Sequence, residues 1–140
     1  MIIVILISSR IDLDKGIKGT LDRFRLRKKY ACVILQENAE INGMLKKVMQ
    51  YVAYGTIDNE TLKELVLKRG KLKGDKPIEA KDITDEFLSN VAKGNFGSMK
   101  PFFRLQPPKG GFKKRSRLLY PKGILGNHGK NLSVLLRRML

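Results

Sequence analysis

The side chains of this sequence that could do chemistry are mainly cations, and they concentrate in its last third. Residues 99–140 contain eleven Lys or Arg residues and no Asp or Glu. Prolines, glycines and aromatic residues stand between them, above all in the stretch 102–122. Lys and Arg neutralise phosphates and release their counterions, while Phe and Tyr rings stack on unpaired bases. This combination predicts that the chain binds a polyanion, with a structured RNA as the first candidate.

Five of these cations lie within nine residues, at Lys109, Lys113, Lys114, Arg115 and Arg117. They would repel one another without a polyanion, so a purely structural role does not explain them. The neighbouring apolar side chains Phe103 and Leu105 are instead expected to pack in the core.

The sequence offers little for catalysis. Its single histidine, His128, has no Cys or acidic neighbour, and a zinc site needs about four ligands. No Ser or Cys stands in an elbow sequence that would use this imidazole as a base. Cys32 lies among apolar residues and is expected to fill a small core position. We therefore expect no enzymatic activity and no metal site.

The glycine-rich stretch 123–130 resembles a phosphate-binding loop only superficially. A P-loop needs Gly where Ile124 stands and Ser or Thr where Asn131 stands, and no strand is predicted before it. Two interpretations stay open. The positive end of the following helix holds one RNA phosphate, or the stretch is a simple turn capped by Asn127 or Asn131.

The overall charge is regional. The net charge is +16, of which residues 99–140 carry +11; the first 98 residues carry +5, from eighteen cations and thirteen acids. A regional excess of this kind favours a binding face over general solubility. The single cysteine suits a reducing cytosol. The apolar N-terminal run 1–7 is too short to span a membrane and has no basic segment before it, so we expect a buried strand there.

These side chains have to be positioned by the rest of the chain, whose first 57 residues alternate between strand and helix patterns. Runs rich in β-branched residues at 2–7, 30–36 and 51–57 predict three strands, the first of them central and covered. Amphipathic segments between them predict two helices. Right-handed crossovers would place both helices on one face of a small sheet. The predicted fold class is therefore α/β, in the order β-α-β-α-β.

Both helices carry cations off their apolar stripes. The first is capped by Asp12 or Asp14 and buries Ile17, Leu21 and Phe24. Its tail holds Arg23, Arg25, Arg27, Lys28 and Lys29, which either compensate the helix dipole or bind phosphate. The second starts at Asn38, with Lys46 and Lys47 outside a stripe made of Ile41, Leu45, Val48, Met49 and Val52.

The remaining chain is expected to be helical with a basic loop. A third helix ends at Gly70 and a fourth runs from Asp82 or Thr84 to Lys93. A short strand is predicted over 102–105, and a last helix over 130–140 with an apolar stripe of Leu132, Leu135, Leu136 and Met139. Both ends of the basic segment are thus anchored, and residues 106–129 form a held loop directed at RNA.

Two stretches carry a resemblance to a known family. One comprises residues 42–48 (Asn-Gly-Met-Leu-Lys-Lys-Val) and 52–58 (Val-Ala-Tyr-Gly-Thr-Ile-Asp), followed by 60–62 and 68–70. The more specific one is 103–112 (Phe-Arg-Leu-Gln-Pro-Pro-Lys-Gly-Gly-Phe), continuing to 120–123 and 125–129. Over its whole length the chain resembles the universal large-subunit ribosomal protein family numbered thirty in bacteria and seven in eukaryotes, in its longer archaeal form.

The resemblance implies a ferredoxin-like core over residues 1–58 and an archaeal and eukaryotic extension over 59–140, with the basic segment 99–129 and a C-terminal helix. It implies a structural ribosomal component in the cytoplasm that binds large-subunit ribosomal RNA beside neighbouring ribosomal proteins, with no membrane, small-molecule substrate, cofactor or catalysis. Together with the charge pattern, it predicts that RNA is bound by Arg23, Arg25, Arg27, Lys28, Lys46, Lys47, Arg104, Lys109, Gly110, Gly111, Lys113, Lys114, Arg115, Arg117, Tyr120, Lys122, Asn127, His128 and Lys130.

Two other hypotheses remain at this point. A free-standing RNA chaperone or regulatory RNA binder would use the same basic surfaces outside ribosomes. An enzyme acting on nucleic acid would have to rely on His128.

Overall fold

The apolar run at the N-terminus forms β1, Ile2–Leu6, in the interior of a six-stranded sheet in the computed structural model, which describes all 140 residues. All five residues of β1 are buried. Ile2, Val4 and Leu6 belong to one apolar cluster, and Ile3 and Ile5 belong to another on the opposite face. Because both faces are covered, the strand has no polar alternation, as predicted.

The strands lie across the sheet in the order β4, β2, β1, β3, β6, β5. β2 (Ala31–Leu35) and β3 (Val52–Thr56) flank β1 and run antiparallel to it. β4 (Phe103–Arg104) pairs with β2 in antiparallel fashion, while β6 (Gly123–Gly129) runs parallel to β3. β5 (Arg115–Leu119) pairs irregularly with β6. The C-terminal third of the chain therefore supplies both edges of the sheet.

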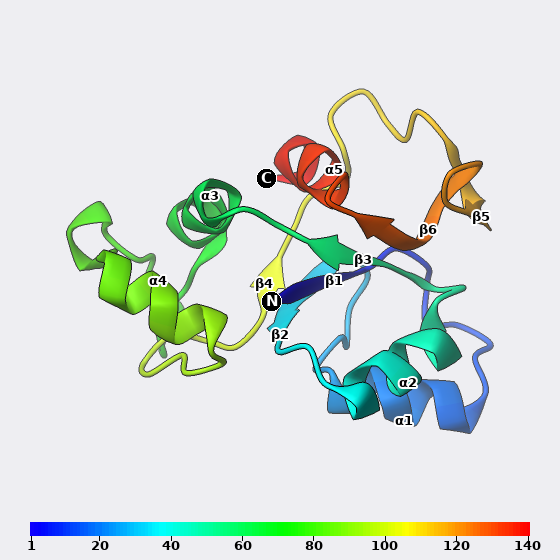
Figure 1. The fold of residues 1–140 in the computed structure, drawn as a ribbon, viewed down its shortest axis with the longest axis horizontal. Helices are drawn as coiled ribbons and strands as arrows, with labels where there is room; N and C mark the ends of the chain where they lie inside the picture. The colour runs from blue at the N-terminus through cyan, green and yellow to red at the C-terminus, as the bar shows by residue number, and fades with distance from the viewer.

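Helices cover both faces of this sheet (Figure 1). α1 (Lys15–Arg23) and α2 (Ala39–Val48) lie together on one face, which confirms the predicted arrangement. α3 (Asn59–Arg69), α4 (Asp85–Ala92) and α5 (Leu132–Met139) contribute to the cluster on the other face. A short 3₁₀ turn, η1, precedes α4. None of these helices is both long enough and apolar enough to cross a membrane.

One part of the predicted topology is wrong. Right-handed crossovers between all three core strands would make neighbouring strands parallel, yet β1 is antiparallel to β2 and to β3. Only the connection β2-α2-β3 joins two parallel strands, and β1 lies between them. This is the split arrangement of a ferredoxin-like core.

The first helix ends earlier than predicted, before most of the cations that were assigned to its tail. α1 stops at Arg23, and Phe24 is its C-cap. The chain then turns, with Arg25 at a φ of 63° and Leu26 buried in the core beneath α1 and α2. Arg25, Arg27, Lys28 and Lys29 therefore lie in the α1–β2 loop and not in the last turn of the helix. Compensation of the helix dipole explains only Arg23.

Most of the other local predictions are confirmed. α2 follows Asn38, although Val52 belongs to β3 and not to the helical stripe. α3 ends at Gly70, and the Thr84 hydroxyl caps α4 by accepting a hydrogen bond from the Phe87 N–H at 3.2 Å. Every member of the predicted apolar stripe of α5 is buried.

The prediction of a loop over 106–129 is wrong in its second half, where β5 and β6 form. β6 contains Gly123, Gly126 and Gly129, which weaken a strand by its local propensity. Its pairing with β3 and the burial of Ile124 and Leu125 outweigh that weakness. At Gly55 the backbones of β3 and β6 approach closely.

Strands from both sides of residue 58 share this sheet. The division into a core over residues 1–58 and an extension over 59–140 therefore stays a prediction.

Candidate nucleic-acid interface

The structure exposes every cation that was predicted to bind RNA. It also exposes Gly110, Gly111 and Asn127, and leaves Tyr120 half-buried. Electrostatic attraction to phosphate requires cations at the surface, so this placement is compatible with RNA binding.

His128 is the exception, because its side chain is only 8% exposed. A ring nitrogen forms a hydrogen bond with the Ile124 carbonyl oxygen, and the ring lies 4.5 Å from that of Tyr120, centroid to centroid. Burial lowers the pKa of His128, and the Lys114 charge adds to that effect against the opposing carbonyl hydrogen bond. The ring is largely buried and offers RNA little surface, and a contact between His128 and RNA stays a prediction. Its contacts instead fix Tyr120 against β6.

Cations from two distant segments meet at the β4 edge of the sheet. β4 pairs with β2 so that Arg104 lies opposite Ala31, beside the α1–β2 loop. A hollow of about 390 Å³, here called the loop hollow, is lined there by Arg25, Arg27, Lys28, Ala31, Pro101, Phe102 and Arg104. The structure thus brings cations of the α1–β2 loop together with Arg104 from the basic last third of the chain.

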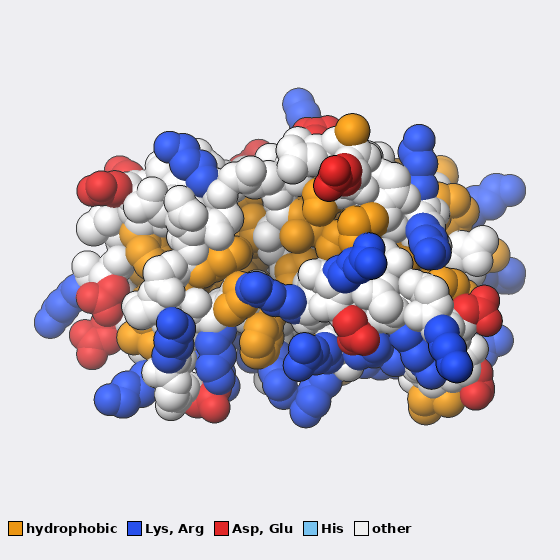
Figure 2. Space-filling model, turned by 90° about the horizontal axis from the view of Figure 1, so that it is seen from below, with side chains coloured by type: hydrophobic (Ala, Val, Ile, Leu, Met, Phe, Trp, Pro, Cys, Tyr) orange, Lys and Arg blue, Asp and Glu red, His pale blue; other side chains and the backbone are white.

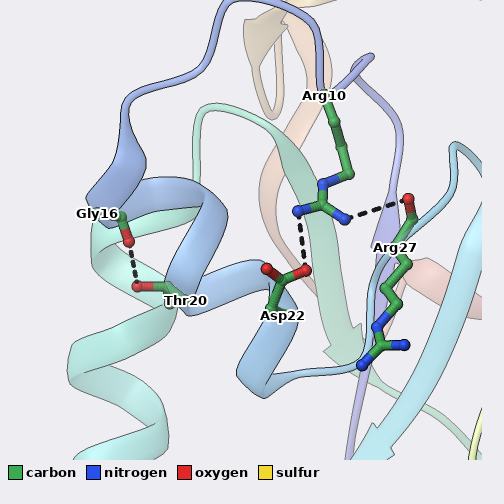
Figure 3. A network of polar contacts seen from close by, with 5 residues as sticks. All are labelled: Arg10, Gly16, Thr20, Asp22 and Arg27. Atoms are coloured by element: carbon green, nitrogen blue, oxygen red, sulfur yellow. Dashed lines mark hydrogen bonds and ion pairs between the residues drawn. The ribbon is translucent and has the colours of Figure 1, made fainter.

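Arg10 holds the α1–β2 loop in place (Figure 3). One of its terminal nitrogens, Nη1, donates to the Arg27 carbonyl oxygen at 3.2 Å, and Nη2 pairs with the Asp22 carboxylate at 2.8 Å. The backbone adds a hydrogen bond from the Leu26 N–H to the Leu21 carbonyl at 2.9 Å. These contacts fix the turn, so the charged ends of Arg25 and Arg27 stand on a rigid base.

A second hollow, of about 370 Å³, opens on the other side of Phe102 and Arg104. We call it the α3 hollow, because it follows the end of that helix. Its other charged lining residues are Lys68, Arg69, Lys71, Lys100 and Asp75. Asp75 forms an ion pair with Lys100, and the hydrogen bond and charge of that lysine lower the pKa of the carboxyl.

Sequence reasoning did not assign the α3 hollow. Lys68 and Arg69 lie in the last turn of α3, where cations are also explained by the helix dipole, and Lys71 and Lys100 lie outside the helices. The structure brings the last two together through the Lys100 N–H, which donates to the Lys71 carbonyl oxygen at 2.8 Å. The only local signal was that all four residues are cations; their proximity to Arg104 depends on tertiary structure.

The basic segment that follows β4 is tied to the end of α5. The Gln106 N–H donates to the Met139 carbonyl at 3.0 Å, and the Lys109 N–H donates to the Arg138 carbonyl at 3.1 Å. The Arg138 guanidinium in turn donates to the Lys109 carbonyl at 3.0 Å. The Phe112 ring lies 6.4 Å from that of Tyr30. The first half of the segment is therefore held, as predicted, although its cations project outward.

The second half forms the β5 edge of the sheet. All five residues of β5 are exposed, including Arg115 and Arg117. The Lys114 ammonium lies 4.7 Å from the centroid of the Tyr120 ring, a distance at which a cation is attracted to the ring face. Lys122 follows in the turn before β6 and is exposed too. This edge presents a row of cations without an acidic neighbour in sequence.

Lys46 and Lys47 are exposed in the last turn of α2 and line neither hollow. In the view of Figure 2, Lys and Arg side chains gather along the lower edge of the face, with few acidic side chains among them.

The sequence left two interpretations of the stretch 123–130, namely phosphate binding at the start of α5 or a simple turn capped by an asparagine. The structure does not identify a binding site under either interpretation. β5 ends shortly before this stretch and β6 runs through it, so the expectation that no strand precedes it is wrong. Neither asparagine caps α5 with its side chain. The Asn127 side chain accepts from the Gly129 N–H, and the Asn131 amide donates to the Tyr120 hydroxyl, both at 2.8 Å. No group of three or more His, Cys, Asp or Glu side chains is placed to hold a metal.

Comparison with known proteins gives one consistent result. Residues 2–52 match the model of the family described as ribosomal protein L30p/L7e. The chain is 36% identical to large ribosomal subunit protein uL30 of Archaeoglobus fulgidus, in an alignment that covers 99% of both chains. It is 35% identical to the protein of that name from Staphylothermus marinus, over 98% of this chain and 96% of the relative. The identity to that of Nitrosopumilus maritimus is 33%, over 99% and 97% respectively.

Proposed function

The chain belongs to the ribosomal protein L30p/L7e family, and from this premise we propose that it is a structural constituent of the large ribosomal subunit that binds ribosomal RNA. The observation that carries the proposal is the match to archaeal relatives of that name along almost the whole chain, extension included. The finer parts of the proposal are its partners, its location and its lack of catalysis. We propose ribosomal RNA and neighbouring ribosomal proteins as partners, on the ribosome in the cytoplasm, without an enzymatic role.

The proposed RNA contacts lie on two basic surfaces. The first comprises the loop hollow and the α3 hollow at the β4 edge. The second is the row of cations from Lys109 to Lys122, which includes those of β5. Lys46 and Lys47, which are exposed on α2 outside both hollows, are proposed as further phosphate contacts. Exposed Lys and Arg side chains on a fixed backbone suit phosphate contacts, which position a protein on RNA without reading its sequence.

A test of the second surface should leave the fold intact. Removing the whole C-terminal segment would not do so, because β4, β6 and α5 belong to the sheet and core. The triple variant Lys113→Gln, Lys114→Gln, Arg115→Gln changes only exposed side chains. Its affinity for large-subunit ribosomal RNA should fall, and the slope of log K against log salt should shrink by about 2–3, for three lost phosphate contacts.

The matched control carries the same three charge losses outside both surfaces, as Lys63→Gln, Lys81→Gln, Lys93→Gln. All three of these lysines are exposed. The control should change the slope by less than the first variant does. Equal slopes for the two variants would contradict the proposed second surface.

The large-subunit assignment is tested separately by sedimentation of a cell lysate in high salt. The chain should sediment with the large subunit. A chain found only in light fractions would instead support the free-standing RNA-binding protein, an alternative that no present observation favours.

A further inference from the structure

Two basic hollows meet at a single aromatic ring. Phe102 and Arg104 line both the loop hollow and the α3 hollow, so the two hollows adjoin at these side chains and are together called the Phe102 groove. Seven further cations line it, against a single acid, Asp75, that is already paired with Lys100. Such an excess predicts an anionic occupant.

Phe102 is less buried than its neighbour Phe103, and packing of the core does not require this difference. Phe103 is 1% exposed and packs in the cluster beneath α3 and α5. Phe102 points to the other face, where it is only half-buried at the margin of the α1–α2 cluster. Its ring lies 5.7 Å from the guanidinium carbon of Arg104. An aromatic face beside a guanidinium plane, open to a basic groove, is a platform on which a nucleobase stacks.

One atom of the groove has no partner in the protein. The Nε of Arg69 is buried and forms no hydrogen bond. A buried N–H without an acceptor costs free energy, so the protein does not fully satisfy this guanidinium. Arg69 lines the α3 hollow, which is compatible with an anion there whose oxygens accept from the guanidinium.

We propose that the Phe102 groove binds an unpaired RNA strand, with one base stacked on Phe102 and its flanking phosphates in the two hollows. In a duplex, the base faces are covered by their neighbours and only phosphates and groove edges remain accessible. The volumes of about 370 and 390 Å³ fall in the range of roughly 300–1,000 Å³ that is usual for pockets of small ligands. The inference rests on the proposed function, because it names the form of RNA that this surface takes.

The test compares two RNA probes on the full chain by fluorescence anisotropy. One probe is a short oligoribonucleotide without self-complementarity, and the other is a duplex of the same strand length. Phe102→Leu keeps an apolar side chain but removes the stacking face. It should weaken binding of the unpaired probe about tenfold and leave duplex binding within about twofold, because one base–aromatic stack is lost. Phe102→Tyr should retain binding of both probes.

Phe96→Leu is the matched control, since Phe96 is also half-buried and lies outside the groove. It should leave binding of both probes within about twofold of the unaltered chain. Thermal unfolding of both Leu variants checks the fold. Arg104→Gln provides a second test that does not depend on the core, because that side chain is exposed. It should weaken binding of the unpaired probe more than Lys81→Gln does.

Three results would overturn the inference. One is equal loss with Phe102→Leu and Phe96→Leu, and another is equal loss for the duplex and the unpaired probe. The third is that an acidic peptide such as polyglutamate competes for the chain as strongly as an unpaired RNA strand of equal charge does. Failure of the chain to sediment with the large subunit would refute the proposed function. The difference in affinity between the unpaired and duplex probes would still test whether the Phe102 groove binds an unpaired strand.

Discussion

Replacing Gly55 by alanine should separate β6 from β3. A Cβ atom built on Gly55 would lie 2.3 Å from the carbonyl oxygen of Gly129 and 3.2 Å from its amide nitrogen. Carbon and oxygen in close contact stay about 3.3 Å apart, so the two backbones would have to move by about 1 Å. Both atoms are backbone atoms in a paired strand, and no side chain can rotate away to relieve the overlap.

The expected loss of stability is about 2 kcal/mol. Overpacking of this kind costs about 1–3 kcal/mol, and the backbone overlap argues for the upper end. Alanine returns part of that cost, about 0.4–1 kcal/mol, because it restricts the unfolded chain more than glycine does. A loss of this size should lower the melting temperature on the order of 5–10 °C for a chain of this length.

Urea unfolding followed by circular dichroism measures the loss, and hydrogen exchange of the β6 amides locates it. Gly43→Ala is the control. Gly43 is exposed in α2, and a Cβ there would have no atom within 4 Å. This substitution should stabilise the chain by about 0.5–1 kcal/mol through helix propensity. If Gly55→Ala unfolds at the same urea concentration as the unaltered chain and its β6 amides stay protected, the close approach of the two strands is refuted.

Two further predictions concern the same half of the molecule. Leu132→Ala in α5 should cost about 2–5 kcal/mol, because Leu132 is fully buried, whereas Val134→Ala at a 64% exposed position should stay within about 0.5 kcal/mol; equal urea midpoints would contradict the packing of α5. Because burial lowers the pKa of His128 in the folded state below its unfolded value of about 6.5, the unfolded chain takes up the proton first on acidification. The free energy of unfolding should therefore fall as the pH is lowered through about 6.5, and His128→Gln should lose that part of the slope between about pH 7.5 and 5.5; an unchanged slope would contradict the burial of the ring.

The first half of the fold could be predicted because its signals are local. The run 2–7 is uniformly apolar, so it had to be a covered strand, and the apolar spacing in 39–48 fits only a helix. The cap at Thr84 and the stop at Gly70 depend on their immediate neighbours and were found where expected. The fold class followed from the order of these elements.

The elements that were missed depend on partners far away in the sequence. The glycines of β6 indicate a turn when they are considered alone, and only pairing with β3 makes them a strand. The cations at 25–29 were expected in a helix tail because they directly follow an apolar stripe that ends at Phe24. In the structure Leu26 fills the core beneath a sharp turn, which redirects those cations to the loop hollow.

The same dependence explains why the site was predicted only in part. The types of residue needed to bind RNA were evident from composition, and every predicted cation is exposed. Their grouping was not, because Lys68 and Arg69 reach Arg104 only when β4 adds to β2. His128 was taken for a contact residue because its glycine-rich neighbours resemble a loop, and its burial follows from β6 becoming a strand.

The sheet itself explains why one short chain carries two basic surfaces. β4 and β5 are its opposite edges, and five strand spacings of about 4.8 Å separate them, a distance of about 24 Å. Arg104 belongs to one edge, and Arg115 and Arg117 to the other. Because β2, β1, β3 and β6 lie between them as one hydrogen-bonded unit, the two surfaces cannot approach each other to follow a flexible strand. A partner that engages both must present its phosphates at a matching separation, as two segments of an already folded RNA do. This rigid spacing suits a component that holds RNA segments in place, and it does not suit a chaperone that must follow RNA while it changes shape.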